Sequence, residues 1–145
     1  MRKTITAAIL AATLASGCAS GPTFNEAKSS FVATPQGQGR IFFYRTTVAG
    51  AAVQPSIYLN GDVVGSAVPG GFFYVDRPAG KFEVSASTET ENKLSFVVDP
   101  GQTRYVRLDM SIGLFVGHVV PRLVDDEQGA KEIQETKYVV EAPKK

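Results

Sequence analysis

Few side chains of this sequence could do acid–base chemistry, and they do not form a recognisable catalytic set. His118 is the sole histidine of the 145 residues and lies in the apolar stretch 116–120. A hydrolase triad needs such a base beside an activated nucleophile. The sequence contains no Gly-x-Ser-x-Gly motif to supply that nucleophile. We therefore interpret His118 as a structural or surface histidine.

Two acidic clusters offer carboxylates, but neither has the setting that chemistry requires. Glu89 and Glu91 flank a predicted loop tip, whereas a glycosidase pair needs a cleft and an apolar environment that raises one pKa. Residues 125–127 (Asp-Asp-Glu) lack the spaced oxygen ligands of a calcium loop and are typical of a helix start. We predict no metal site, no cofactor and no enzymatic activity.

The single cysteine is the residue whose surroundings indicate a definite chemistry. Cys18 cannot form an intramolecular disulfide, because it has no partner. It follows a basic start (Arg2, Lys3) and about a dozen mostly apolar residues, which is typical of a secretory signal. That stretch is shorter than the roughly 20 apolar residues that span a bilayer. We expect residues 1–17 to be a signal peptide cut between Gly17 and Cys18; a buried N-terminal helix is the alternative.

Residues 14–18 (Leu-Ala-Ser-Gly-Cys) resemble the lipobox of bacterial lipoproteins. In that family the cysteine thiol takes a diacylglyceryl group, a peptidase cuts before the cysteine, and the new amine is acylated. Ala15 stands where the family usually has Leu. The resemblance implies that Cys18 is lipidated with chains such as palmitate, each buried CH₂ adding about 0.8 kcal/mol of membrane affinity. A chance cysteine at an ordinary signal-peptide end is the alternative.

The position after the cysteine bears on where the anchored protein goes. Position 19 is Ala. In enterobacterial lipoproteins, an Asp at the position after the cysteine resembles a signal that retains the protein in the inner membrane. We therefore expect attachment to the outer membrane of the cell envelope, with the folded part facing the periplasm. Without Arg2 and Lys3 the mature chain has 13 basic against 14 acidic residues. This near-neutral balance without a basic cluster argues against a nucleic-acid partner.

The elements that must position these residues begin after a region rich in Gly, Ser, Thr and Pro. We expect residues 18–39 to be the lipidated cysteine and a flexible tether spanning roughly 25 Å. Residues 40–141 are expected to form one β-domain and residues 142–145 a tail. Runs of β-branched and aromatic residues are separated by turn signals such as Asn60-Gly61, a spacing that predicts a sandwich or barrel. Strands are expected at residues 40–45, 56–59, 62–65, 72–75, 81–87, 94–98, 103–110 and 115–124, a helix at 125–135 and an edge strand at 138–140.

Aromatic residues are the strongest candidates for a binding surface. Tyr44, Tyr58, Tyr74 and Tyr105 lie in predicted strands together with several phenylalanines. One hypothesis is an exposed stacking platform for sugar or peptide. The alternative is that these rings cover a second sheet face beneath the tether or the C-terminal helix. Arg45 and Arg107 are expected to pair with Asp62, Asp76 or Asp109.

From Arg40 to about Ile133 the chain resembles the bacterial lipoprotein family known as domain of unknown function 2846. The order of several short motifs carries the resemblance: residues 41–45, 57–61, 71–73, 78–81 and 100–107. The layout is also similar to immunoglobulin- and transthyretin-like modules. The resemblance implies an all-β, antiparallel β-sandwich with one short C-terminal helix, and no activity. We expect a non-catalytic module that binds or scaffolds an envelope protein, or, alternatively, binds peptidoglycan or another glycan.

Overall fold

The computed structural model describes residues 17–87, 92–113 and 117–139. Glu89 and Glu91 lie outside the described residues, as do most of the expected leader and the expected tail. The strands are β1 (Gln38–Tyr44), β2 (Ser56–Leu59), β3 (Asp62–Ser66), β4 (Gly71–Pro78), β5 (Gly80–Ala86), β6 (Lys93–Val98), β7 (Thr103–Ile112), β8 (Gly117–Val124) and β9 (Lys137–Tyr138). The helices are α1 (Phe24–Ala27), α2 (Asp126–Glu132) and the 3₁₀ turns η1 (Lys28–Ser30) and η2 (Ile133–Glu135).

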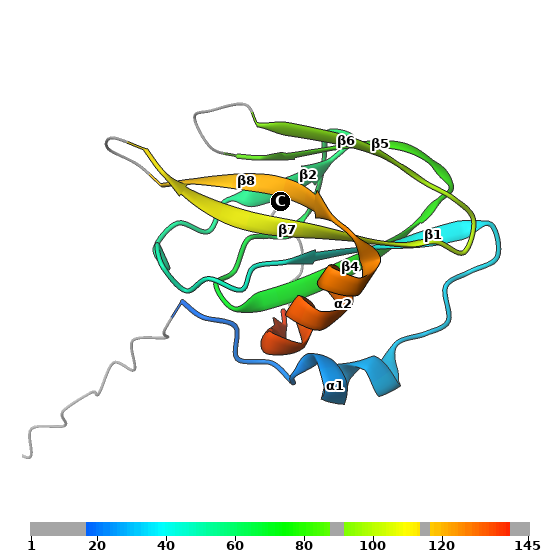
Figure 1. Cartoon of the computed structure of the whole chain (residues 1–145), viewed down its shortest axis with the longest axis horizontal. Coiled ribbons are helices and arrows are strands. Elements are labelled where there is room, and N and C mark those ends of the chain that lie inside the picture. Colours follow the sequence, from blue (N-terminus) through cyan, green and yellow to red (C-terminus); the bar gives the residue numbers. More distant parts are fainter. Residues whose placement is uncertain (1–16, 88–91, 114–116, 140–145) are drawn as a thin grey trace, which may run out of the picture.

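The strands form two facing sheets, which confirms the predicted all-β sandwich with one short C-terminal helix. The first sheet has the order β8-β7-β1-β4-β9 and the second the order β3-β2-β5-β6. Helices α1 and α2 lie on the outer face of the first sheet, opposite the second sheet (Figure 1). Among the described residues, no helix is both long and apolar enough to cross a bilayer.

Two strand pairs differ from the all-antiparallel arrangement that we expected. β1 runs parallel to β7, and β4 runs parallel to β9, while the other pairs are antiparallel. The chain leaves β1, builds strands of both sheets and only then returns beside β1 as β7. A parallel pair needs such a long crossover. No turn motif in the local sequence predicts the parallel pairing.

The centre of the sandwich is built from the inward-facing side chains of both sheets. Ile41 and Phe43 of β1 meet Ile57, Phe82 and other apolar residues of the second sheet, and all of these are buried. The Phe43 and Phe73 rings stack with their centroids 5.0 Å apart. Strand β1 is apolar on both faces, and both faces are covered.

A second apolar cluster lies on the outer face of the first sheet. Phe42, Tyr44 and Phe72 project there and pack against Ala27 of α1 and Ile133 of η2. Phe24 and Phe31, from the region before β1, make edge-on ring contacts with Phe72 and with one another, and they contribute the outer layer. This cluster explains why the sequence carries more strand aromatics than one core layer can bury.

Where the sequence led us to expect a flexible tether, the structure packs residues 19–31 against the sheet. The capping box Thr23–Glu26 starts α1, and Phe24 and Phe31 insert beside Phe72. The backbone of this segment also bonds to the residue just before β9: Phe24 N donates to Thr136 O at 3.2 Å. The two ends of the described chain therefore meet beside β4, at the edge of the first sheet that β9 forms. The apolar burial and these hydrogen bonds hold the segment in place, although its Gly- and Ser-rich composition favours a flexible chain.

Candidate functional site

The four tyrosines proposed as a binding platform do not come together. Tyr44, Tyr74 and Tyr105 lie on the outer face of the first sheet, and Tyr58 lies on the second sheet. The side chain of Tyr44 is 0% exposed. Tyr105 stacks on Phe42 at 5.5 Å, and Tyr74 contacts Phe31 at 4.8 Å. Three of the four rings are thus covered by the helices and by residues 24–31.

Beneath α2, the covered face carries a polar network. The Tyr44 hydroxyl donates to Glu132 at 2.6 Å, and Arg107 donates to Glu132 at 2.9 Å. Arg107 also donates to Asp109 at 2.7 Å, and Asp109 accepts from Arg122 at 3.0 Å. The expected Arg107–Asp109 pair is present. The network joins three strands to the C-terminal helix.

Burial and hydrogen bonding shift the ionisation of this network in opposite directions. Burial and the hydrogen bond to Glu132 raise the pKa of Tyr44 above its ordinary value of 10.0. Burial alone raises the pKa of Glu132, but the hydrogen bonds that it accepts, first that from Tyr44, bring its pKa below 4.5. Glu132 is therefore a carboxylate that stabilises the fold and not a proton donor.

We expect the Glu132→Gln variant to lose part of the acid sensitivity of the fold. Because the pKa of Glu132 is lower in the folded state, its contribution is present above its ordinary pKa of 4.5 and is lost as pH falls through the folded value. At neutral pH the variant should be about 1 kcal/mol less stable. Urea unfolding from pH 7 to pH 3 measures both effects. Glu127→Gln, on the exposed side of α2, is the control; an equally steep acid loss in both variants would contradict the assignment.

One end of the sandwich is held by an arginine without a carboxylate partner in the described part of the chain. Arg45 follows β1 and is 0% exposed. Its guanidinium donates to the backbone carbonyls of Val53 and Ala67 at 2.7 and 2.9 Å, and of Ala49 and Gly50 at 2.7 and 3.1 Å. The predicted ion pair of Arg45 is therefore wrong. Burial lowers the pKa of Arg45, and the nearby Cys18 opposes that shift.

Cys18 lies at this same end, which we call the Cys18 rim. The rim consists of residues 46–55 and 66–71, the last residues of β7 and the first residues of β8. Hydrogen bonds hold both neighbours of Cys18: Ala19 N donates to Pro69 O at 3.0 Å, and Gln54 Nε2 donates to Gly17 O at 2.6 Å. Cys18 itself is exposed, and its thiol forms no disulfide.

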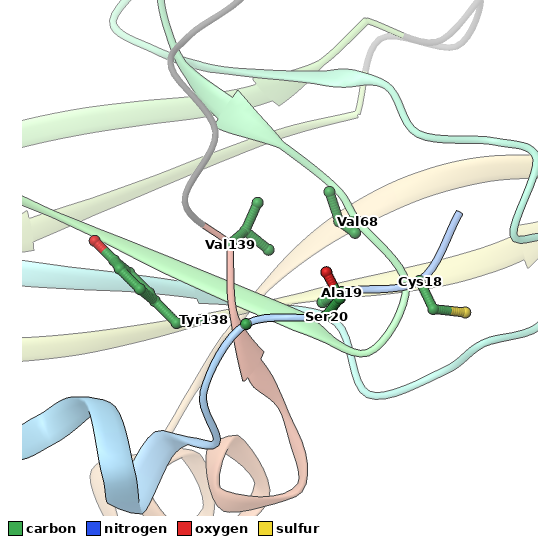
Figure 2. A pocket seen from close by; sticks show the side chains of 7 residues that line it. Cys18, Ala19, Ser20, Val68, Tyr138 and Val139 are labelled. Atoms are coloured by element: carbon green, nitrogen blue, oxygen red, sulfur yellow. The ribbon is translucent and has the colours of Figure 1, made fainter. Parts of the chain in front are cut away.

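A small hollow opens beside Cys18. It has a volume of about 300 Å³ and is lined by residues 18–21 together with Val68, Tyr138 and Val139. Figure 2 shows that the Cys18 sulfur points away from Tyr138 and Val139. The thiol therefore extends outward from the rim, where a group bonded to it meets no obstruction from these side chains.

A larger groove lies on the rim between residues 47–53 and the β7–β8 pair. Its volume is about 580 Å³, and apolar side chains including Val53, Met110, Ile112 and Val120 line most of it. Asp109 and Arg122, which pair with each other, also line it. Neither this groove nor Gln54 was predicted from the sequence. The sequence feature that could have indicated the groove is the run 46–55, which contains no charged residue.

The remaining sequence candidates occupy separate places. His118 is half-buried on β8 opposite Ser111, and its Nδ1 has no hydrogen-bond partner among residues 17–87, 92–113 and 117–139. Asp125 caps α2 by accepting from Gln128 N at 2.9 Å, which confirms that the acidic run starts a helix. In the described residues, no three His, Cys, Asp or Glu side chains gather as metal ligands.

Fold and surface together define an all-β sandwich with a helix-covered outer face and an exposed cysteine at one rim. The chain belongs to the family described as "Protein of unknown function (DUF2846)", whose model matches residues 35–119. The matched range includes β1 to β7 and excludes Cys18 and α2. An uncharacterized protein of Haemophilus influenzae is 28% identical over 134 residues, which cover 89% of this chain and 80% of that protein. No solved structure matches.

Proposed function

We propose that the protein is a lipid-anchored lipoprotein of the bacterial cell envelope whose sandwich is a non-catalytic binding or scaffolding module. In this proposal residues 1–17 are removed, Cys18 carries the lipid, and the domain faces the periplasm from the outer membrane. The exposure of Cys18, with its sulfur directed away from Tyr138 and Val139, carries the proposal. Lipidation of a thiol needs such access.

The surroundings of His118 support a non-catalytic role. A general base is usually oriented by a third group that accepts its second ring N–H. In the part of the chain that the structure describes, Nδ1 of His118 is buried without any partner. Ser111 lies opposite His118 on β7, but no carboxylate orients the imidazole toward it. Glycan binding draws no support from the tyrosines, because Tyr44 is buried and Tyr58 lies on the other sheet.

Intact mass spectrometry of the protein extracted from membranes tests the anchor. The expected mass is that of residues 18–145 plus a diacylglyceryl group and one further acyl chain. A bare Cys18, or a chain that retains residues 1–17, would overturn the proposal. Crosslinking in intact cells followed by capture of the tagged protein tests the binding module. We expect one dominant envelope partner whose crosslinking is lost on surface mutation.

The Cys18→Ala variant should lose the whole acyl mass. Without the thiol there is no atom to accept the diacylglyceryl group, and we expect the peptidase to leave residues 1–17 attached. The same mass measurement reads both changes. Ser20→Ala, also exposed and two residues away, is the matched control and should mature as the wild type does. Normal acylation of the Cys18→Ala protein would place the lipid elsewhere.

A further inference from the structure

The distance between the anchor and the folded domain is very short. The sequence predicted a tether spanning roughly 25 Å, yet Ala19, the residue after Cys18, is bonded to Pro69 O on the Cys18 rim. Consecutive Cα atoms are about 3.8 Å apart. A lipid on Cys18 therefore starts within about one residue of the rim. The domain cannot stand away from a bilayer that holds this lipid unless residues 19–31 first detach.

The hydrogen bond from Gln54 can be kept after residues 1–17 are removed, with a new acceptor in place of Gly17 O. Gln54 Nε2 donates to Gly17 O, the carbonyl of the amide on the Cys18 nitrogen. Cleavage removes Gly17, and acylation of that nitrogen builds a new amide. The carbonyl of this acyl amide takes the same covalent position as Gly17 O, so it stands where Gln54 can donate to it. The Gly17 contact thus represents the acylated state of Cys18.

The surface around the anchor suits lipid. Residues 46–55 and 66–71 contain no Asp, Glu, Lys or Arg. Ile112 is 89% exposed and Val48 61% exposed, and both lie at this end of the first sheet. Asp109, at the edge of the groove, is paired with Arg122. An uncharged surface with protruding aliphatic side chains is typical of a protein face that contacts a membrane interface.

We propose that the Cys18 rim lies directly on the phospholipid leaflet that holds the anchor, with Ile112 and Val48 in contact with lipid and Gln54 bonded to the acyl amide of Cys18. This inference rests on the proposed lipidation. The contact is confined to the side of the rim formed by the first sheet and residues 46–55. The opposite end, with Val32 and Val97, then faces away from the membrane and is available to a partner.

A single fluorescent label tests this orientation. Because Cys18 is the only cysteine and its thiol is occupied by lipid, Ile112→Cys supplies one reactive thiol in the full lipidated chain. Val97→Cys, 49% exposed near the other end of the second sheet, is the matched control. The labelled proteins are placed in vesicles of phosphatidylethanolamine and phosphatidylglycerol that contain a nitroxide-bearing lipid. We expect the label at position 112 to lose most of its emission and the label at position 97 to keep it.

Equal emission from the two labels in protein of full acyl mass would overturn the orientation and leave the lipid anchor intact. A bare Cys18 thiol, seen in the mass of the same sample, would instead remove the proposed function. Protection of the position-112 label from iodide without quenching by the nitroxide lipid would mean cover by protein, a second copy included, and would also overturn the inference. Adding Gln54→Glu, which cannot donate, should weaken the quenching at position 112. Unchanged quenching would overturn the role of Gln54.

Discussion

Replacement of Arg45 by Met should lower the free energy of unfolding by about 3 kcal/mol, because a buried carbonyl left without its donor costs about 1–3 kcal/mol. Met fills similar apolar volume but donates no hydrogen bond. The carbonyls of Val53 and Ala67, both bonded at under 3 Å, would lose their donor at the closed end of the sandwich. Residues 46–55 would then lose the contacts that hold them against β1. Urea unfolding of the full chain in detergent, followed by circular dichroism, measures the change.

Arg104→Met is the control for this prediction. Arg104 also bonds to a backbone carbonyl, that of Val97 at 3.0 Å, but its surroundings are open to solvent. Exposed substitutions of this kind usually change stability by less than about 0.5 kcal/mol. A loss in Arg45→Met no larger than in Arg104→Met would show that residues 46–55 hold their conformation without the guanidinium.

Gly129→Ala should destabilise the protein by roughly 2 kcal/mol, although alanine is the better helix former by about 1 kcal/mol. A Cβ at position 129 would lie 2.3 Å from Cγ of Tyr105 and 2.4 Å from its Cβ. Tyr105 has little freedom to move, since its ring is stacked on Phe42. Helix α2 would have to lift from the sheet and would weaken the bond between Tyr44 and Glu132.

The same glycine-to-alanine change at Gly80 provides the comparison. No atom lies within 4 Å of a Cβ placed there, and its φ is not positive, so the variant should be as stable as the wild type. Thermal unfolding of the two variants side by side separates overlap at α2 from a general effect of the substitution. A more stable Gly129→Ala protein would mean that helix propensity dominates and that α2 packs loosely.

Much of the architecture could be predicted because its signals are local. Alternation of side chains, the Asn60-Gly61 turn and the acidic run from Asp125 each depend on neighbouring residues, and the structure has β2, β3 and α2 at those places. Asn60 and Gly61 both have positive φ, 51° and 88°, as a tight hairpin turn requires. Pro121 lies within β8, although proline has no backbone N–H to donate to a neighbouring strand. It is tolerated within β8 because β8 is the outer strand of its sheet.

The features that escaped prediction depend on distant residues. The composition of residues 18–39 indicated a tether, but Phe24 and Phe31 pack on β1 and on β4, which lies much further along the chain. Arg45 was matched with carboxylates because ion pairing is the common fate of arginine, whereas its partners are carbonyls of an irregular loop. The candidate site could be predicted only in part. Cys18 was singled out from the sequence, whereas Gln54 reaches Gly17 only through folding.

The joining of the two chain ends at β4 determines when the fold can be completed. Phe24 N bonds to Thr136 O, Tyr138 N bonds to Pro22 O, and Thr23 bridges to Lys137. The backbone bonds of residues 22–24 therefore cannot form until residues 136–138 have been synthesised, whereas Phe24 and Phe31 can already pack on Phe42 and Phe72. The edge of the first sheet is therefore completed late, by contacts that join the segment before β1 to the segment that contains β9.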